Sequence, residues 1–183
     1  MMRLVVAITG ASGILYSQNF LEAARNHGIE THLIISEAAK LVAKHENVKI
    51  EELMALSDYY YTPKNLEAPL SSGSYRMDGM VIIPCSMKTL GALANGYAEN
   101  LVIRAAEVQL KEKRPLILVP RETPLHTIHL ENMSKLSRIG VVILPAMPGF
   151  YHNPKKLEHL ADFITGKILD QLEIDNEKFK RWS

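Results

Sequence analysis

The sequence predicts an α/β fold: one parallel sheet with helices on both faces, within a single domain. Short apolar runs recur along the chain, and at least one helix-like segment separates each from the next. This alternation is typical of parallel strands joined by helical crossovers. The residues after several runs are small, hydroxyl-bearing or charged, and open α/β sheets bind ligands beyond the carboxyl ends of their strands. The runs fall at residues 4–8, 32–35, 80–83, 116–119 and 141–144.

The composition limits the classes of function. A chain of 183 residues with 47% hydrophobic content is long enough for one sizeable core, so we expect one domain over residues 1–183. A formal net charge of +1 gives no global attraction to nucleic acid or to an anionic membrane. No apolar run approaches the roughly 18 residues of a membrane span. Cys85 is the only cysteine, and with no recognisable signal peptide we expect a cytoplasmic protein without an intrachain disulfide.

Two helices are expected from periodicity and from their end signals. The first covers about residues 14–27, with Ile14, Leu21 and Ala24 on one face and Gly28 as its stop. The second covers about residues 101–111 and follows Asn100, which is a good N-cap.

The last helix has the clearest pattern. We expect Asn153 to cap it and Pro154 to occupy its first turn. Its apolar positions repeat at helical spacing, namely Leu157, Leu160, Ala161, Ile164 and Ile168. Trp182, near the end of the chain, is either mobile or folds back onto a neighbour.

Residues 57–76 break the alternation with tyrosines, prolines, serines and a glycine. We interpret this stretch as a long loop that includes at most a short strand. Loops of this length in compact domains are often functional or interfacial.

Three loops at strand ends are candidate anion sites. Gly10-Ala11-Ser12-Gly13 opens the first helix, where backbone N–H groups and the helix dipole favour an anion. A tight structural turn explains the same residues equally well. Ser36 follows the second run, and a plain N-cap is the simpler interpretation of it. Ser86, Lys88 and Thr89 follow the third run and suit a phosphate or a polar ring edge.

Charged pairs follow in the second half of the chain. Arg104 and Lys111 are seven residues apart on one expected helix, so they share a face, and solvated surface charge is the default interpretation. Arg121 and Glu122 stand at the end of the fourth run, before Pro124, with Thr123 as the expected cap of the next helix. This position at the sheet edge favours a function over surface decoration.

Other reactive residues carry weaker signals. The spacing of His126 and His129 lets their two side chains point the same way. No third ligand has matching spacing, although Glu131 is nearby, so we expect no metal. Cys85 has no neighbouring histidine in sequence and is more typical of an inert buried thiol.

Taken together, these segments resemble the UbiX family of flavin prenyltransferases, and the resemblance covers nearly the whole chain. The matching motifs are Thr9-Gly10-Ala11-Ser12-Gly13, Ser36-Glu37-Ala38-Ala39, Ser72-Gly73-Ser74, Pro84-Cys85-Ser86-Met87-Lys88-Thr89-Leu90, Arg104-Ala105-Ala106, Leu110-Lys111-Glu112, Pro120-Arg121-Glu122-Thr123-Pro124-Leu125-His126, His129-Leu130-Glu131-Asn132-Met133 and Phe150-Tyr151-His152.

The resemblance implies a Rossmann-like flavoprotein fold, assembled as a dodecamer, and a metal-independent reaction. That reaction joins the dimethylallyl group of dimethylallyl monophosphate to N5 and C6 of reduced FMN, and a UbiD-type decarboxylase uses the prenylated FMN. The FMN contacts implied are Gly10, Ala11, Ser12, Ser36, Ser86, Met87, Lys88, Thr89 and Arg121. The prenyl phosphate contacts implied are Tyr151, Lys167, Arg104 and Lys111, and the catalytic residues implied are Glu122, Ser12, Glu46 and Lys111.

The chain departs from the family pattern at three places. Tyr16-Ser17-Gln18-Asn19 replaces a common Tyr-Gly-x-Arg sequence, Lys167 stands where relatives often have arginine, and Leu66 stands where some have an aromatic residue. Two alternatives to prenyl transfer are an FMN-dependent cysteine decarboxylase and a non-catalytic flavin carrier. The first helix has no histidine before His27, which disfavours the decarboxylase, and the combination of Glu122, Tyr151 and Lys167 favours turnover.

Overall fold

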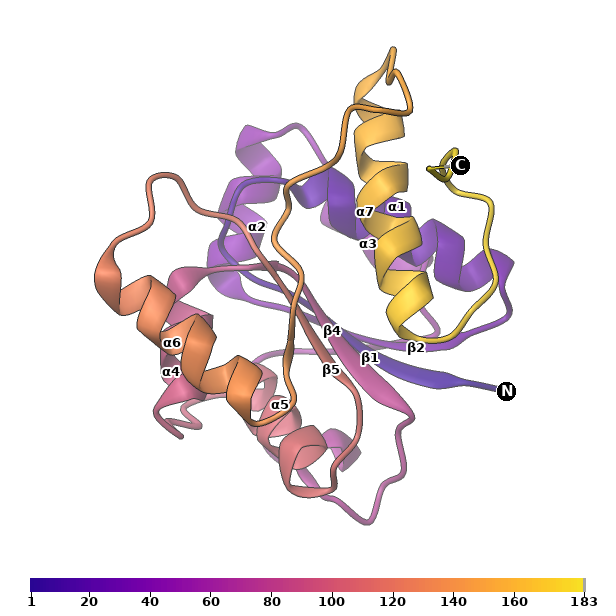
Figure 1. Cartoon of the computed structure of the whole chain (residues 1–183). Helices are drawn as coiled ribbons and strands as arrows, with labels where there is room; N and C mark the ends of the chain where they lie inside the picture. Colours follow the sequence, from indigo (N-terminus) through magenta and orange to yellow (C-terminus); the bar gives the residue numbers. More distant parts are fainter. Residues whose placement is uncertain (183) are drawn as a thin grey trace.

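A single six-stranded parallel sheet forms the centre of the molecule (Figure 1). The computed structural model describes residues 1–182, and its strands follow the order β3-β2-β1-β4-β5-β6. The chain therefore winds outwards from β1 in one direction and then from β4 in the other, which confirms the Rossmann-like prediction. The strands are β1 (Arg3–Ile8), β2 (Glu30–Ile35), β3 (Tyr59–Tyr61), β4 (Gly79–Cys85), β5 (Leu116–Pro120) and β6 (Val142–Ile143).

Helices cover both faces of this sheet because the side chains of each central strand alternate between two cores. Leu4, Val6 and Ile8 face one core, and Val5 and Ala7 face the other. The first core is closed by α1 (Ile14–Asn26), α2 (Glu37–His45), α3 (Ile50–Ala55) and α7 (Leu157–Gln171). The second is closed by α4 (Met87–Ala94), α5 (Leu101–Lys111) and α6 (Thr127–Arg138).

The predicted ends of two helices are confirmed. Helix α1 ends at Asn26, with His27 as its C-cap before Gly28, and Ile14, Leu21 and Ala24 are buried as expected. Helix α5 begins after Asn100, whose side-chain oxygen accepts a hydrogen bond from the Ile103 N–H at 3.2 Å. Ser36 likewise caps α2, where its hydroxyl accepts from the Ala39 N–H at 3.1 Å.

The predicted start of the last helix was wrong. Helix α7 begins at Leu157, and Lys156 rather than Asn153 occupies the cap position. Asn153 has a left-handed backbone with φ of 55°, which is incompatible with an N-cap, and its side-chain oxygen accepts from Lys155 Nζ at 2.8 Å instead. Leu157, expected on the buried face, is exposed.

Two further boundaries differ from the prediction. Helix α6 begins at Thr127, not after Thr123, because the Thr123 N–H donates to its neighbour Glu122 at 2.9 Å and the loop continues to His126. Strand β6 is only two residues long, although residues 141–144 were expected to pair. Backbone bonds to β5 nevertheless continue beyond it, from the Leu144 N–H to the Leu118 carbonyl at 2.8 Å and from the Ala146 N–H to the Pro120 carbonyl at 3.0 Å.

The segment 57–76 is a loop with one short strand, as predicted. It contains β3 and the 3₁₀ helix η1 (Pro69–Ser71). Two arginines hold the second half of this loop. Arg104, in α5, donates from Nε to the Ser71 carbonyl at 3.1 Å, and Arg114, just after α5, donates to the Gly73 carbonyl at 2.8 Å. Within residues 1–182, no helix is both long and apolar enough to cross a membrane.

Hydrogen bonds tie the strand-end loops to one another across the sheet. The Thr9 hydroxyl donates to the Pro84 carbonyl at 2.8 Å and accepts from the Ser86 N–H at 2.8 Å. Ser36 N–H donates to the Ile8 carbonyl at 3.0 Å, and Arg121 N–H donates to the Cys85 carbonyl at 3.3 Å. The loops that follow β1, β2, β4 and β5 therefore form one connected edge.

We predict that Thr9→Val lowers the free energy of unfolding by about 1–3 kcal/mol, because the methyl group leaves the buried Ser86 N–H and Pro84 carbonyl without the partner that joins them. Thr127→Val, the same change at an exposed position, is the control and should have almost no effect. Urea unfolding of both variants at equal protein concentration measures the difference. Equal loss in the two variants would contradict the role given to Thr9.

Candidate functional site

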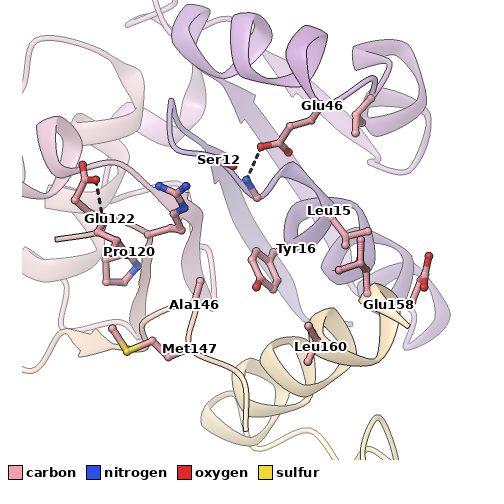
Figure 2. Close-up of a pocket in the computed structure, with 15 residues that line it drawn as sticks. Ser12, Leu15, Tyr16, Glu46, Pro120, Glu122, Ala146, Met147, Glu158 and Leu160 are labelled. Carbon is pink, nitrogen blue, oxygen red and sulfur yellow. Dashed lines mark hydrogen bonds between the residues drawn. The ribbon is translucent and has the colours of Figure 1, made fainter. Parts of the chain in front are cut away.

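The largest cavity lies at the carboxyl edge of the sheet, between the loops that follow β1, β5 and β6 (Figure 2). Its volume is about 680 Å³. Polar and charged residues line one part of it, and apolar residues from α1, α7 and the loop after β6 line the rest. The polar and charged set is Ser12, Tyr16, Glu46, Arg121, Glu122, Thr123 and Glu158, and the apolar set includes Leu15, Val48, Pro120, Ala146, Met147, Leu157 and Leu160.

Glu46 occupies the anion site that the sequence predicted at the start of α1. Its carboxylate accepts hydrogen bonds from the Gly13 N–H at 2.7 Å and from the Ile14 N–H at 2.8 Å. The protein's own carboxylate thus caps the helix and complements its dipole. This helix end is therefore already occupied and is not free to bind a ligand phosphate. The same two hydrogen bonds hold the Glu46 carboxylate at a fixed place on the cavity wall.

Arg121 and Glu122 approach the same cavity from the opposite side, at the end of β5 (Figure 2). Tyr16 lines the same cavity near Arg121. Burial raises the pKa of the Tyr16 hydroxyl, and the Arg121 guanidinium partly offsets this increase. The structure therefore brings together Ser12, Glu46, Arg121 and Glu122, four of the predicted site residues, around one half-apolar space.

A second cavity of about 430 Å³ lies on the other side of the Gly10 loop. Gly10, Ser36, Ser86, Lys88 and Thr89 line it, as the sequence grouped them. Helices α2 and α4 both begin here, and Ser86 caps α4 by accepting from the Thr89 N–H at 3.3 Å. Hydroxyl donors and helix N-termini are the groups that bind phosphate in proteins.

Two features of this second cavity were not predicted. Lys88, a cation at a helix start, is compensated by Glu99, whose carboxylate lies 2.8 Å from Lys88 Nζ. Gly10 approaches α2 so closely that a Cβ atom there would lie 2.5 Å from Ala38 Cβ. Any larger residue at position 10 would push the loop away from the helix.

The resemblance implies that Met87 and Ala11 contact the flavin, but neither residue lines the two cavities. Ala11 is buried, and Met87, the first residue of α4, is half-buried and packs against the second core.

Arg104 and Lys111 line neither cavity. Arg104 donates to the Ser71 carbonyl, and Lys111 forms a close ion pair with Glu112. Both lie along α5, next to the loop 71–75, where a Cβ on Gly73 would lie 2.7 Å from Lys111 Nζ. Within one chain, these cations are separate from Glu122.

Tyr151 and Lys167 form a third group, around α7. The Tyr151 ring makes edge contacts with Phe163 and Trp182, with ring centroids 5.9 and 5.4 Å apart. Lys167 Nζ lies 3.4 Å from Asp170 Oδ2. The contact of Trp182 shows that the C-terminal segment folds back, which was one of the two alternatives considered.

The weaker candidates have structural explanations. Cys85 is buried, and burial raises the pKa of its thiol well above the usual range, which keeps the thiol protonated. His126 and His129 stack on each other with ring centroids 3.5 Å apart. Among the residues that the structure describes, no cluster of three His, Cys, Asp or Glu side chains could hold a metal ion.

Sequence reasoning missed most of the apolar cavity wall. Leu15, Val48, Ala146, Met147 and Leu160 lie on different elements and share no motif. Tyr16 had a signal, since it belongs to the segment that departs from the family pattern, but nothing in the sequence showed that its ring faces Arg121.

Comparisons with known proteins agree with this geometry. The flavoprotein family model matches residues 1–176. A flavin prenyltransferase UbiX from Methanothermobacter thermautotrophicus is 49% identical over 181 residues, which cover 98% of this chain and 95% of the relative. The chain belongs to the UbiX family of flavin prenyltransferases.

Solved UbiX structures have the same fold. A dodecameric FMN-dependent UbiX-like decarboxylase from Escherichia coli O157:H7 superposes with a TM-score of 0.97 at 45% identity, covering 100% of both chains. The UbiX protein AnUbiX (PadA1), in complex with FMN and dimethylallyl pyrophosphate, has a TM-score of 0.97 at 44% identity, covering 100% of this chain and 97% of the other.

Proposed function

We propose that this protein is a flavin prenyltransferase that joins a dimethylallyl group to reduced FMN. The observation that carries the proposal is one half-apolar cavity that is lined by two carboxylates, Glu46 and Glu122, and by Arg121. The carboxylates suit proton transfer at a flavin edge, and the apolar wall suits a C5 hydrocarbon. The known members of its family support the same activity.

The two cavities would bind different parts of the flavin. The second cavity offers hydroxyl groups and two helix N-termini, so it suits the FMN phosphate. The first holds the ionisable residues, so the reacting edge of the flavin belongs there. Gly10, Ser12, Ser36, Ser86, Thr89 and Arg121 then line one continuous path along the sheet edge.

The chain's residues have separate tasks in the transfer. As the bond between the allylic carbon and the phosphate breaks, charge grows on the phosphate oxygens, where Tyr151, Lys167, Arg104 and Lys111 would stabilise it. Glu46 and Ser12 would orient N5 of the flavin. Ring closure at C6 uses the double bond of the transferred group, so one alkene carbon gains a proton while C6 loses one. Glu122 would relay this proton together with the departing phosphate, whose second pKa near 6 suits a proton carrier.

An oligomer would complete this site. Arg104 and Lys111 are separate from Glu122 within one chain, and the surface carries many exposed apolar side chains, including Tyr97, Ile128, Leu130, Ile139, Met147 and Phe150. Exposed apolar surface of this kind marks an interface. The E. coli relative is dodecameric, and we propose the same assembly here, with Arg104 and Lys111 reaching the cavity of a neighbouring subunit.

The product would be prenylated FMN for a UbiD-type decarboxylase, and we place the reaction in the cytoplasm. The alternatives are a cysteine decarboxylase and a flavin carrier. The relatives named flavin prenyltransferases, matched over nearly the full chain, argue against the first. The cavity beside Glu122 gives a reaction space that a carrier does not need.

Anaerobic incubation of the protein with FMNH2 and dimethylallyl monophosphate, followed by mass measurement of the flavin, tests the activity. We expect FMN plus one C5 unit, formed equally well with EDTA present because the site residues form no metal-ligand cluster. A parallel reaction with the diphosphate shows which donor is used. An unchanged flavin mass with both donors would overturn the proposal.

We predict that Glu122→Gln keeps FMN affinity within a few fold but lowers the rate of prenyl transfer by about 10²–10⁴, the usual loss for a positioned proton-transfer group. Glu158→Gln, the same change on another carboxylate at the same cavity, is the control and should keep normal turnover.

Lys167→Ala should instead raise KM for the prenyl donor by at least about tenfold, because the charge of Lys167 meets the phosphate before and during the reaction. Stopped-flow and steady-state kinetics separate the effects, and normal turnover in Glu122→Gln would refute its role.

We also predict that two inactive variants complement each other. Subunits with Glu122→Gln and subunits with Lys111→Ala, co-expressed and purified together, should recover about a quarter of the active sites on random mixing if each site takes Glu122 and Lys111 from different chains. Each variant alone is the control. No recovery in verified mixed oligomers would show that both residues act from the same subunit.

A further inference from the structure

The C-terminal segment, residues 175–182, folds back along α7 (Figure 1). The chain reverses after the helix, where Glu173 has a left-handed backbone with φ of 58° and the Ile174 N–H bonds the Leu169 carbonyl at 2.9 Å. The segment then lies beside the same helix that carries Lys167. Its course therefore determines what surrounds Lys167 and Tyr151.

Apolar contacts seat the middle of this segment. Phe179 packs on Phe163 with ring centroids 4.7 Å apart. It also covers Gly166, where a Cβ atom would lie 2.6 Å from the Phe179 ring. Only a glycine at this position of α7 lets the ring approach the helix so closely. Lys178 adds an ion pair with Asp162 at 2.9 Å.

A second and stronger attachment lies at Asp170. The Arg181 guanidinium donates to both oxygens of this carboxylate, at 2.7 Å to Oδ1 and 3.0 Å to Oδ2. Asn176 Nδ2 donates to Oδ1 at 3.0 Å. Bidentate pairs between arginine and a carboxylate fix geometry as well as charge. Chiefly through the hydrogen bonds of Arg181, these contacts hold the pKa of Asp170 at about 2. The carboxylate is therefore ionised at neutral pH, and the attachment is lost only as the pH falls through that value.

Lys167 shares this carboxylate but is held less firmly. Its Nζ lies 3.4 Å from Oδ2, the oxygen that Arg181 also contacts. Two cations therefore share one carboxylate, which cannot neutralise both of them. Because Arg181 makes the short, bidentate contact, Lys167 keeps donors for another anion.

The end of the segment reaches Tyr151. The Trp182 ring meets the Tyr151 ring edge-on, with centroids 5.4 Å apart. Trp182 directly follows Arg181, so the pair between Arg181 and Asp170 sets where this indole lies. The Asp170 carboxylate therefore affects both sites: it contacts Lys167 directly, and through Arg181 it positions the Trp182 ring against Tyr151.

We propose that Asp170 is a positioning residue that fastens the C-terminal segment over Tyr151 through Arg181 and, by doing so, leaves Lys167 available to the phosphate of the prenyl donor. The fastening itself rests on contacts within this chain. Its effect on the prenyl donor rests on the function proposed above, which assigns Tyr151 and Lys167 to that phosphate.

The mobility of the segment can be measured without any substrate. Trp182 is the only tryptophan, so its fluorescence anisotropy decay reports on this segment alone. Trypsin cleavage at the Lys178–Phe179 bond, followed by mass, is a second measure. For Asp170→Asn and Arg181→Gln we expect a larger fast component in the anisotropy decay and cleavage about fivefold faster, the range for loss of a well-formed ion pair in a locally opening segment.

Arg181→Lys, which retains the charge, should fall between these variants and the wild type. Lys180→Gln, which removes an exposed neighbouring cation, should behave as the wild type at the Lys178–Phe179 bond. Arg181 is exposed, so Arg181→Gln leaves the core intact even if Asp170→Asn folds poorly. Unchanged mobility in both Asp170→Asn and Arg181→Gln would overturn the fastening, whatever the enzyme's activity.

Kinetics then test the positioning role. We expect Asp170→Asn and Arg181→Gln to raise KM for dimethylallyl monophosphate by about five- to tenfold with kcat within about twofold, because the donor site is loosened while the proton-transfer residues are untouched. Partial recovery of KM in Arg181→Lys supports the same role. A mobile segment with unchanged KM would overturn the positioning role. If the wild-type protein prenylates no flavin, the proposed function fails, while the mobility measurements still decide the fastening.

Discussion

The hydrogen bonds of the Thr9 hydroxyl are the constraint on which the ligand-binding edge depends. This one group joins the end of β1 to the end of β4, which are adjacent strands whose chain connections leave in opposite directions. The sheet order creates a crevice at that point. Further backbone bonds from Ser36 and Arg121 extend the connection to β2 and β5. The loops are therefore rigid relative to one another, as a preorganised site requires.

On this rigid edge, the charges are arranged so that binding and chemistry occupy different places. The helix N-termini of α2 and α4 serve the second cavity, while the N-terminus of α1 is already neutralised by Glu46. The first cavity is left with carboxylates, one guanidinium and apolar walls. A phosphate thus has its favourable surroundings on one side of the Gly10 loop, and proton transfer has them on the other.

The remaining cations lie outside both cavities and depend on larger-scale organisation. Arg104 and Lys111 belong to α5, on the opposite face of the sheet from α7. Lys167 and Tyr151 belong to the unit formed by α7 and the returning C-terminal segment. Under the proposed function, a site that draws on all three regions would need both a second subunit and a fixed C-terminal segment, and the ion pair of Asp170 would hold that segment.

The sequence by itself determined the order of strands and helices, because apolar runs and helical periodicity are local patterns. It also determined the caps Ser36 and Asn100 and the grouping of residues at the strand ends. It failed at the starts of α6 and α7, where Thr123 and Asn153 were the expected caps. The Thr123 N–H instead bonds the Glu122 side chain, and the Asn153 side chain accepts from Lys155 within the loop. Only the tertiary structure decided that Glu46 caps α1, that Tyr16 lies near Arg121 and that Arg181 binds Asp170. These pairs are from 11 to more than 100 residues apart in sequence, and no local pattern encodes them, because their distance is set by how the sheet and helices pack.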